Sequence, residues 1–543
     1  MRRTIVSILI IVVMFVIHGA TSIHAQEEIN PNILAVIHRL STEQSTTMRT
    51  ANQLCTVYGP RLTGSPQLTE ASGWVMTQLR EWGMNNIHKE SWQFGRGWSM
   101  QTFWINAVQP VPFQVLAYPE AWSPGTNGNI LADAVIFDAH DPSDFEKYRG
   151  TLAGKIVLEE TVKTIAPRFK PLATRLGDDE LLGYANAPAP EESHGMQLPD
   201  WLLAQFKRDR KVYNFLIEEK PAAIFFRGQV GGDRGIVFPD AALTYTSDTT
   251  TPDWFMNVSP SYSLSAGPMV PQVLVSVEHY NRLYRLAKMG FPVKIEMQLD
   301  VKFHEKDSLA YNIIAEIPGE DPGLKQEVVM LGAHLDSWHG GTGATDNAAG
   351  CAVMMDVMRI LRSVFNETGT KPRRTIRLAL WSGEEQGLKG SIAYVNQHFA
   401  ELEGKSYNLK RKKILKEHES LSAYYNLDFG TGKIRGVYLQ GNLAVLPIFR
   451  KWLEPFQEYG ASTLSPGGLG GGSGSDHMPF DVAGLPGFMF IQDLIEYRTL
   501  THHSVMDEYD HLVEKDLQQS AEIIVAFVYQ TAQRDQRLPR KND

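Results

Sequence analysis

Histidine and carboxylate residues recur directly after apolar runs in the second half of this 543-residue chain. His334 and Asp336 stand in the sequence GAHLD at 332–336, just after the apolar run 327–331. In open α/β sheets ligands bind at the carboxyl ends of the strands, where these two side chains would emerge. An imidazole is a good metal ligand, and a carboxylate commonly holds its second ring nitrogen. We therefore predict that His334 binds metal and that Asp336 orients it, although a single histidine after a strand is also compatible with a structural role.

Two further segments add carboxylates. Asp346 lies in the small-residue sequence GATDNAAG at 343–350, which predicts a tight turn before a helix. Its two oxygens could bridge two cations, and the alternative is that it caps the helix. Glu384 and Glu385 follow the apolar run 375–381. Adjacent side chains at a strand end point in different directions, so Glu385 can bind metal while Glu384 moves protons.

Two more residues complete the set. Asp428 closes the apolar run 423–427, and His503 lies in the sequence HHSVMD at 502–507. Two imidazoles and three carboxylates suit zinc, cobalt or manganese rather than copper(I) or an iron–sulfur cluster. Two cations about 3.5–4 Å apart lower the pKa of a water between them to about 7 and polarise a carbonyl. Amide hydrolysis then needs neither a serine nor a cysteine nucleophile. The predicted ligands are His334, Asp346, Glu385, Asp428 and His503.

These motifs, in this order, resemble the co-catalytic two-zinc exopeptidases, the family of bacterial leucyl aminopeptidases, carboxypeptidase Q and glutamate carboxypeptidase II. The resemblance implies two Zn²⁺ per chain, with Co²⁺ or Mn²⁺ as substitutes, and a general base at Glu384. It assigns His334, Asp346 and Asp428 to one ion. It assigns Asp346, Glu385 and His503 to the other.

The family resemblance extends to two other segments. The family places an Asp four residues after its last ligand histidine, and Asp507 stands four residues after His503. This spacing favours His503, while His502 stays the alternative. The sequence GPRLTGSP at 59–66 is similar to the family's opening segment.

The resemblance implies an exopeptidase that acts on short peptides as an aminopeptidase or dipeptidase. Two alternatives are a non-catalytic receptor or binding protein on the same fold and an acyl transferase resembling glutaminyl cyclase. The intact ligand set and Glu384 disfavour the first, and an inserted module disfavours the second. Tyr497, Arg498 and His477 are candidates to grip the substrate terminus, and a structural role is the favoured alternative for each.

The second half of the chain alternates short β-rich runs with helical stretches, which predicts a largely parallel sheet covered by helices on both faces. We expect an α/β fold with a three-layer α/β/α zinc-exopeptidase core and a mixed, mostly parallel sheet. The predicted strands are 311–317, 327–331, 375–381, 423–427 and 487–491. The predicted helices are 67–82, 348–364, 391–399, 444–459 and 512–533.

Residues 126–289 differ, because they are rich in Pro, Gly and short β-like pieces. GKIVL at 154–158 and PAAI at 221–224 resemble a protease-associated domain, an inserted β-rich module that shapes the cleft. Residues 26–125 and 290–543 would then be two parts of one catalytic domain. The glycine-rich stretch 467–474 is predicted to line the site, with a linker as the alternative.

The first 25 residues predict an export signal, because Arg2 and Arg3 precede the apolar run 4–17 and a cleavage site at 22–25. An uncleaved anchor is the alternative, although the run is shorter than the ~20 residues of a membrane-spanning helix. We expect a periplasmic or extracellular protein without stable membrane association after cleavage.

Composition narrows the partners. With 43% hydrophobic and 21% charged residues the chain is an ordinary globular protein, and its net charge of -9 gives no attraction for nucleic acid. Short peptides are the expected partners, and a homodimer stays open. Cys55 and Cys351 cannot form a sulfur-based zinc site, and we expect Cys351 to be buried, with a disulfide between the two as the alternative.

Overall fold

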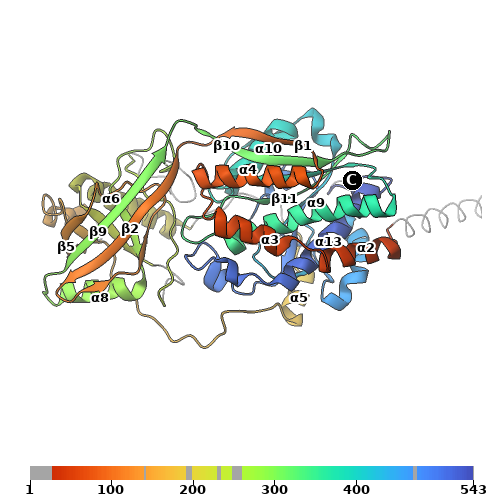
Figure 1. Cartoon of the computed structure of the whole chain (residues 1–543). Coiled ribbons are helices and arrows are strands. Elements are labelled where there is room, and N and C mark those ends of the chain that lie inside the picture. Colours follow the sequence, from red (N-terminus) through yellow and green to blue (C-terminus); the bar gives the residue numbers. More distant parts are fainter. Residues whose placement is uncertain are drawn as a thin grey trace, which may run out of the picture.

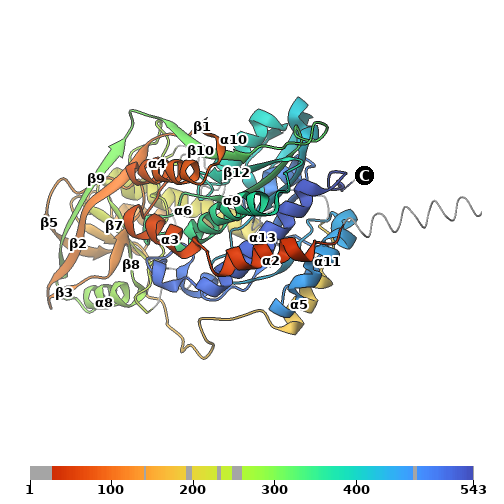
Figure 2. The same ribbon diagram turned by 45° about the vertical axis from the view of Figure 1, so that its right-hand side comes forward.

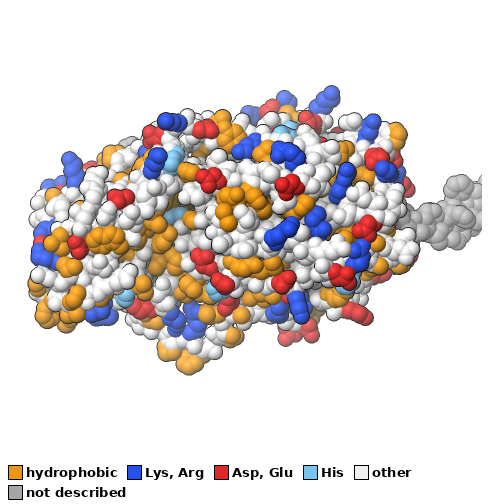
Figure 3. All heavy atoms as spheres, in the orientation of Figure 1, with side chains coloured by type: hydrophobic (Ala, Val, Ile, Leu, Met, Phe, Trp, Pro, Cys, Tyr) orange, Lys and Arg blue, Asp and Glu red, His pale blue; other side chains and the backbone are white. Residues whose placement is uncertain are grey.

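The computed structural model describes residues 27–139, 142–190, 199–228, 234–246, 260–468 and 474–541. Within these residues two eight-stranded sheets lie side by side, and a pair of long strands in the second sheet leads across to the first (Figure 1). The described part contains no helix of the length and apolar character that crossing a bilayer requires. The predicted export signal at 1–25 lies outside it. On the face drawn in Figure 3, acidic and basic side chains are interspersed.

The first sheet, called the core sheet here, has the strand order β1-β10-β12-β11-β15-β18-β16-β17. Strands β12, β11, β15 and β18 are parallel, whereas β10 and β16 run antiparallel to their neighbours in this group. The parallel strands are almost wholly buried, as expected when helices cover both faces. The bounds are β1 Asn85–Gln93, β10 Leu309–Ile317, β11 Val328–His334, β12 Thr375–Trp381, β15 Leu421–Asn426, β16 Ile434–Tyr438, β17 Thr463–Ser465 and β18 Gly487–Gln492.

Helices cover both faces of the core sheet (Figure 2). One apolar cluster joins the sheet to α2 (Pro31–Thr42), α4 (Pro66–Glu81), α9 (Ala349–Thr368), α11 (Leu446–Leu453) and α13 (Glu514–Gln533). A second cluster joins it to α10 (Lys389–His398) and α12 (Met478–Val482). α3 (Thr47–Asn52) contacts α9. The predicted three-layer α/β/α core is therefore confirmed.

The second sheet has the order β3-β2-β9-β5-β6-β7-β8-β4. Helix α6 (Asp200–Glu219) packs on one of its faces and α8 (Val277–Lys288) on the other. The sheet takes in strands on both sides of the predicted module at 126–289, whose assignment as a protease-associated domain stays a prediction. Its strands are β2 Gly97–Gln109, β3 Phe113–Gln114, β4 Ala117–Pro119, β5 Ile130–Ile136, β6 Ile156–Leu158, β7 Ala223–Arg227, β8 Gln272–Val275 and β9 Lys294–His304.

Two connections tie the sheets together. β1 leads into β2, and β9 leads into β10, so the long β2–β9 pair joins the two sheets. A separate excursion carries α5 (Asp178–Ala185) back to the core sheet. There Arg175 forms ion pairs with Asp493 (2.8 Å) and Asp516 (2.7 Å).

Local chemistry explains several element boundaries. Pro66 opens α4 after Ser65, whose side chain accepts a hydrogen bond from the Leu68 amide. The predicted helix at 444–459 is split, because Pro455 has no N–H to continue the α-helical pattern, and a 3₁₀ turn Glu454–Tyr459 follows α11. β13 (Ala400–Glu403) and β14 (Lys410–Ile414) form a small separate sheet. Cys55 and Cys351 are both buried and free, so no disulfide joins them.

Candidate metal centre

The five side chains predicted to bind metal lie together at the carboxyl ends of neighbouring parallel strands. His334 is the last residue of β11, and Glu385 and Asp428 follow β12 and β15. His503 lies beyond β18, after the turn Tyr497–Thr501. Asp346 sits in the buried turn Ala344–Ala348 that leads into α9. The structure thus places these residues where open α/β sheets bind their ligands.

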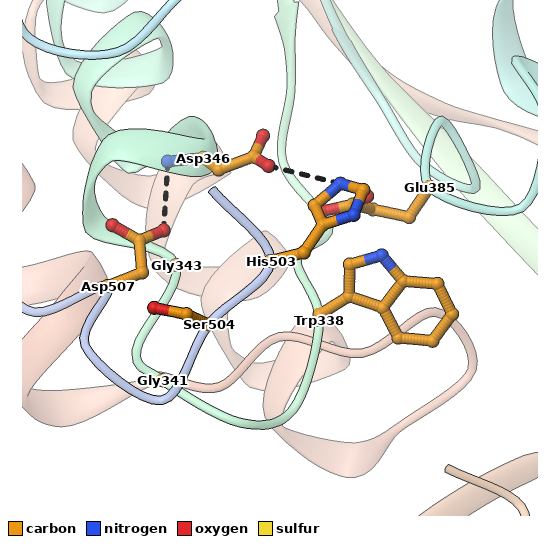
Figure 4. A pocket seen from close by; sticks show the side chains of 8 residues that line it. All are labelled: Trp338, Gly341, Gly343, Asp346, Glu385, His503, Ser504 and Asp507. Atoms are coloured by element: carbon orange, nitrogen blue, oxygen red, sulfur yellow. Dashed lines mark hydrogen bonds and ion pairs between the residues drawn. The ribbon is translucent and has the colours of Figure 1, made fainter. Parts of the chain in front are cut away.

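Asp346 stands between the two histidines. Its Oδ1 lies 3.2 Å from His334 Nε2. Its Oδ2 lies 3.4 Å from His503 Nε2 (Figure 4). Each histidine has a second carboxylate, since Asp428 Oδ1 is 2.9 Å from His334 Nε2 and Glu385 Oε2 is 3.0 Å from His503 Nε2. The arrangement is two half-sites, each with one histidine and one carboxylate of its own, that share Asp346.

Asp336 lies behind His334. The Nδ1 atom of His334 is 3.0 Å from the backbone carbonyl oxygen of Asp336 and 3.7 Å from its carboxylate. The carboxylate itself accepts a hydrogen bond from Thr63 Oγ1 (2.9 Å) and contacts the amides of Glu384 and Glu385 at 3.4 Å. Asp336 therefore restrains both His334 and the loop that carries Glu384 and Glu385. Its contact with His334 is closer through its backbone carbonyl than through its carboxylate.

His502 and His503 both approach Asp346. Their rings stack with centroids 3.8 Å apart. His503 reaches Asp346 and Glu385 at 3.4 and 3.0 Å, whereas His502 Nε2 lies 3.8 Å from Asp346 Oδ2. The geometry favours His503 as the residue of the second half-site, with His502 beside it.

Asp507 fixes the turn that carries Asp346. Its Oδ1 accepts hydrogen bonds from the amide and the hydroxyl of Thr345, both at 2.7 Å. Its Oδ2 accepts one from the Asp346 amide at 3.0 Å (Figure 4). Burial and the nearby Asp346 raise the pKa of Asp507 to about 7. The Asp that stands four residues after His503 thus positions the shared carboxylate.

The donor set fits metal cations. Asp346 Oδ2 and Glu385 Oε1 are buried and have no hydrogen-bond partner, which native proteins avoid unless an ion or water meets the atom. Donor atoms of His334, Asp346 and Glu385 lie within 4.8 Å of one another, as do those of His334, Glu384 and Asp428. A third such group is Asp346, His502 and His503. A small pocket of about 10 Å³, lined in part by Asp346, Glu385 and His503, has room for one small occupant such as a water molecule.

Comparison with known proteins relates part of this chain to a peptidase family. Residues 312–528 match the sequence profile of peptidase family M28, and that stretch contains all five predicted ligands and Glu384. This part of the chain is therefore similar to peptidase family M28.

Sequence relatives of this chain include carboxypeptidase Q from Mus musculus, 28% identical over 273 residues, which are 50% of this chain and 52% of the relative. Aminopeptidase YwaD from Bacillus subtilis is 29% identical over 221 residues, covering 39% of this chain and 42% of the relative. The chain spans about half the length of the curated relatives it matches.

Solved structures share the M28 fold. A peptidase M28 precursor from Shewanella amazonensis superposes with a TM-score of 0.62 at 22% identity, over 94% of this chain and 98% of that one. BSAP, a zinc aminopeptidase from Bacillus subtilis, gives a TM-score of 0.53 at 17% identity, over 90% of this chain and 95% of that one. At these identities the likeness establishes the fold alone.

Charges in the candidate metal centre perturb each other strongly. Burial raises the pKa of Glu384 well above its usual range, and the Asp428 carboxylate adds to the effect while His334 opposes it. Burial also raises the pKa of Glu385 to about 7. Burial by itself would lower the pKa of His503, but Glu385 and Asp346 raise it to about 9. A cluster of groups with strongly shifted pKa values is typical of functional sites.

The three residues that the sequence suggested for gripping the substrate take different places. His477 is buried and its Nε2 bonds the Gln440 side chain at 2.9 Å, which makes it structural. Arg498 lies over the Phe429 ring, 5.4 Å from its centroid. Tyr497 packs on His502, with ring centroids 4.7 Å apart. Part of the glycine-rich stretch, 469–473, lies outside the described residues.

Sequence reasoning missed Trp338. Its indole lines the pocket beside His503, with ring centroids 6.0 Å apart, and its Nε1 is buried without a hydrogen-bond partner (Figure 4). The only signal was its place two residues after Asp336, in the loop that follows β11. Trp338 also contacts Trp122 near the second sheet, so it lies where the two parts of the molecule meet.

Proposed function

We propose that this M28 chain is an exported exopeptidase that holds two Zn²⁺ ions and cleaves short peptides as an aminopeptidase or dipeptidase. The observation that supports this most directly is Asp346, which presents one oxygen to each of two histidine–carboxylate pairs. The names of carboxypeptidase Q and of the BSAP zinc aminopeptidase support the reaction class and the metal.

The ligands divide by half-site. His334 and Asp428 would hold one ion with Asp346, and Glu385 and His503 would hold the other with the same carboxylate. Zinc supplies Lewis-acid polarisation of the scissile carbonyl and makes water acidic enough to attack near neutral pH. The protein fixes this geometry through Asp507 and Asp336, which restrain the turn and the loop that carry the ligands.

Glu384 is the proton carrier in this proposal. It follows Gly383 at the end of β12, next to the ligand Glu385, and lies within reach of His334 and Asp428. Its carboxylate would take a proton from the attacking water and deliver it to the nitrogen of the leaving amine. Its raised pKa suits that second step, because a buried carboxyl group with charged neighbours holds a proton more firmly than a solvated one.

Tyr497 provides a donor beside the reaction centre. Burial raises the pKa of its phenol well above the usual value, and the next contributors are the carboxylates of Asp346, Asp428 and Glu385. The phenol ring packs on His502, with ring centroids 4.7 Å apart, and its raised pKa keeps it protonated near neutral pH. We assign it to donate a hydrogen bond to substrate oxygen.

The test is hydrolysis by the full chain with and without metal. Dipeptides with a free amino group and their N-acetylated forms are incubated with zinc-loaded protein, chelated protein and protein to which zinc has been returned. Cleavage that disappears on chelation and returns with zinc supports the proposal. Zinc-loaded protein that binds peptides without cleaving them would favour a binding protein, and pyroglutamate formation would favour a cyclase.

Export rests on residues 1–25, in which Arg2 and Arg3 precede an apolar run. Intact mass of the protein recovered from the medium or periplasm tests this part. A chain that begins near Gln26 supports export with cleavage, and a full-length chain in the membrane fraction supports the anchor.

A further inference from the structure

A segment that leaves the second sheet reaches the residues that lead to His503. This segment, called the arm here, is residues 160–177, which run from the carboxyl end of β6 to α5 on the core sheet (Figure 1). The arm begins on α8, where the Glu160 amide donates to the Tyr280 hydroxyl at 2.7 Å. Residues 166–171 then cross to the core with exposed side chains and without helix or strand. The arm therefore joins the two sheets by a route separate from the β2–β9 pair.

The core end of the arm is seated on a buried carboxylate. Asp493 directly follows β18 and is fully buried. It accepts a hydrogen bond from the Leu176 amide at 3.0 Å, and it pairs with Arg175 and Arg435, each at 2.8 Å. Arg435 also donates to the Leu176 carbonyl oxygen at 2.9 Å, and Arg175 reaches Asp516 at 2.7 Å. Because a buried carboxylate is costly without its cations, these contacts give the arm one defined place on the core.

Next to this seat the arm bonds the chain that leads to the second half-site. Thr174 and Ile495 exchange two backbone hydrogen bonds, each 2.9 Å long. Thr499 Oγ1 donates to the Leu172 carbonyl oxygen at 2.7 Å. Thr499 stands four residues before His503, in the turn that precedes this histidine. Three hydrogen bonds thus connect the arm to the segment that presents His503.

The backbone of this segment is strained at both ends. Ile495 has φ 49° and His503 has φ 59°, in the left-handed region that a β-branched residue such as isoleucine rarely adopts. Strained conformations persist only where the surrounding structure enforces them. For Ile495 the amide and the carbonyl oxygen both bond to Thr174. The arm is therefore the element that holds Ile495, and with it the direction in which the chain runs to His503.

We propose that the arm positions His503 for metal binding, with Arg175 as the positioning residue that seats the arm. This inference rests on the proposed two-zinc centre and adds a condition to it, because the second half-site is complete only while the arm is docked on the core. His334 and Asp428, by contrast, extend directly from β11 and β15. Release of the arm should therefore affect the two half-sites unequally.

The first measurement needs no metal. Hydrogen–deuterium exchange is followed by mass spectrometry in the metal-free full chain, in peptides that span 494–504. Arg175→Ala and Thr499→Val each remove a contact of the arm, and Arg149→Ala is the matched control, because it breaks an exposed ion pair with Glu146. Arg175→Ala should speed exchange in 494–504 about tenfold, the lower end of the range for losing a hydrogen bond to a charged group, because the Arg175 side chain is half exposed.

Thr499→Val should speed exchange in the same peptides by a smaller factor, because it removes a bond between neutral groups. It keeps every charge of the arm, so it tests the same contact in a chain that folds even where Arg175→Ala does not. Peptides of α9 should exchange at the wild-type rate in both variants, and Arg149→Ala should change neither region.

Zinc titration against a competing chelator then follows the two half-sites. Arg175→Ala should weaken one of the two binding steps about tenfold and leave the other within about twofold of the wild type. Arg175→Lys should recover part of the loss. The double variant Arg175→Ala with Ile495→Asn should also recover part of it, because asparagine tolerates a positive φ without the arm.

Wild-type exchange of 494–504 in both arm variants, or equal weakening of both zinc steps in Arg175→Ala, would overturn the inference. A wild type that binds no zinc removes the two-zinc proposal, whereas the exchange rates of the metal-free chain still decide whether the arm holds the turn. Two zinc ions bound normally by an Arg175→Ala chain remove only the role of the arm.

Discussion

Arg61 should contribute more to stability than any surface arginine of this chain, because its buried guanidinium joins the opening segment to the loop before Asp346. Nε donates to Leu335 O (2.8 Å), and Nη2 donates to Gly343 O (2.9 Å). Nη1 donates to Thr342 O (2.8 Å) and Leu54 O (3.2 Å). The side chain is fully buried, so water cannot replace these bonds.

The magnitude follows from the four carbonyl groups. Each buried acceptor that loses its donor costs about 1–3 kcal/mol, and the costs are not additive where neighbours relax together. We therefore expect Arg61→Ala to lower the free energy of unfolding by about 4 kcal/mol or more. Losses of this size are typical of substitutions that break a buried hydrogen-bond network. Arg61→Lys should lose about half as much, because an ammonium offers three donors without the planar fork.

Urea unfolding followed by tryptophan fluorescence measures this effect, and zinc titration of the folded variants measures its consequence at the site. Arg61→Lys should bind zinc more weakly than the wild type, since the loop 335–343 is less restrained. Arg80→Ala, an exposed change on α4, is the matched control and should stay within about 0.5 kcal/mol. An Arg61→Ala protein within about 1 kcal/mol of the wild type would refute the reasoning.

Three further outcomes are expected. Glu384→Gln should lower kcat about 10²- to 10⁴-fold while zinc content, measured by mass spectrometry, stays unchanged; loss of zinc would make Glu384 a ligand instead. Zinc affinity should fall as the pH drops below about 9, because the raised pKa of His503 lets protons compete with zinc for the imidazole. The expected fall is about tenfold per pH unit for each proton displaced. Chelator competition from pH 6 to 9 measures it, and a constant zinc affinity over that range would contradict the prediction. His503→Ala should weaken zinc binding far more than His502→Ala, and equal losses by calorimetry would reverse the assignment of the second half-site.

The α/β core could be predicted from the sequence, because its strands and helices follow from the pattern of hydrophobic residues and from their order along the chain. The parallel strands are continuous apolar runs, and α9 is apolar on nearly all sides, so both could only be buried. A metal-binding type of residue follows each of these runs. Because the carboxyl ends of parallel strands share one edge of the sheet, His334, Glu385 and Asp428 were predicted to meet there. Edge strands such as β1, whose residues are largely polar and exposed, gave no such pattern.

Contacts between distant segments were not predictable. Asp346 can face both histidines because Asp507 holds its turn from the far end of the domain, and spacing alone suggested only that Asp507 follows a histidine. Likewise, no local pattern pairs Val237 with Val505, two residues after His503, because that contact depends on how the second sheet is docked on the core. The roles of Trp338 and Arg61 were not predicted for the same reason, since the residues that they contact lie in other segments.

The most direct test of the central claim is the zinc content of the purified full chain, measured by mass spectrometry after dialysis, for the wild type and for Asp346→Ala. A shared carboxylate between two half-sites predicts about two zinc ions per wild-type chain and a loss of both, or all but a weakly held one, in the variant. A wild type that holds no zinc, or an Asp346→Ala protein that keeps both ions, would contradict the account.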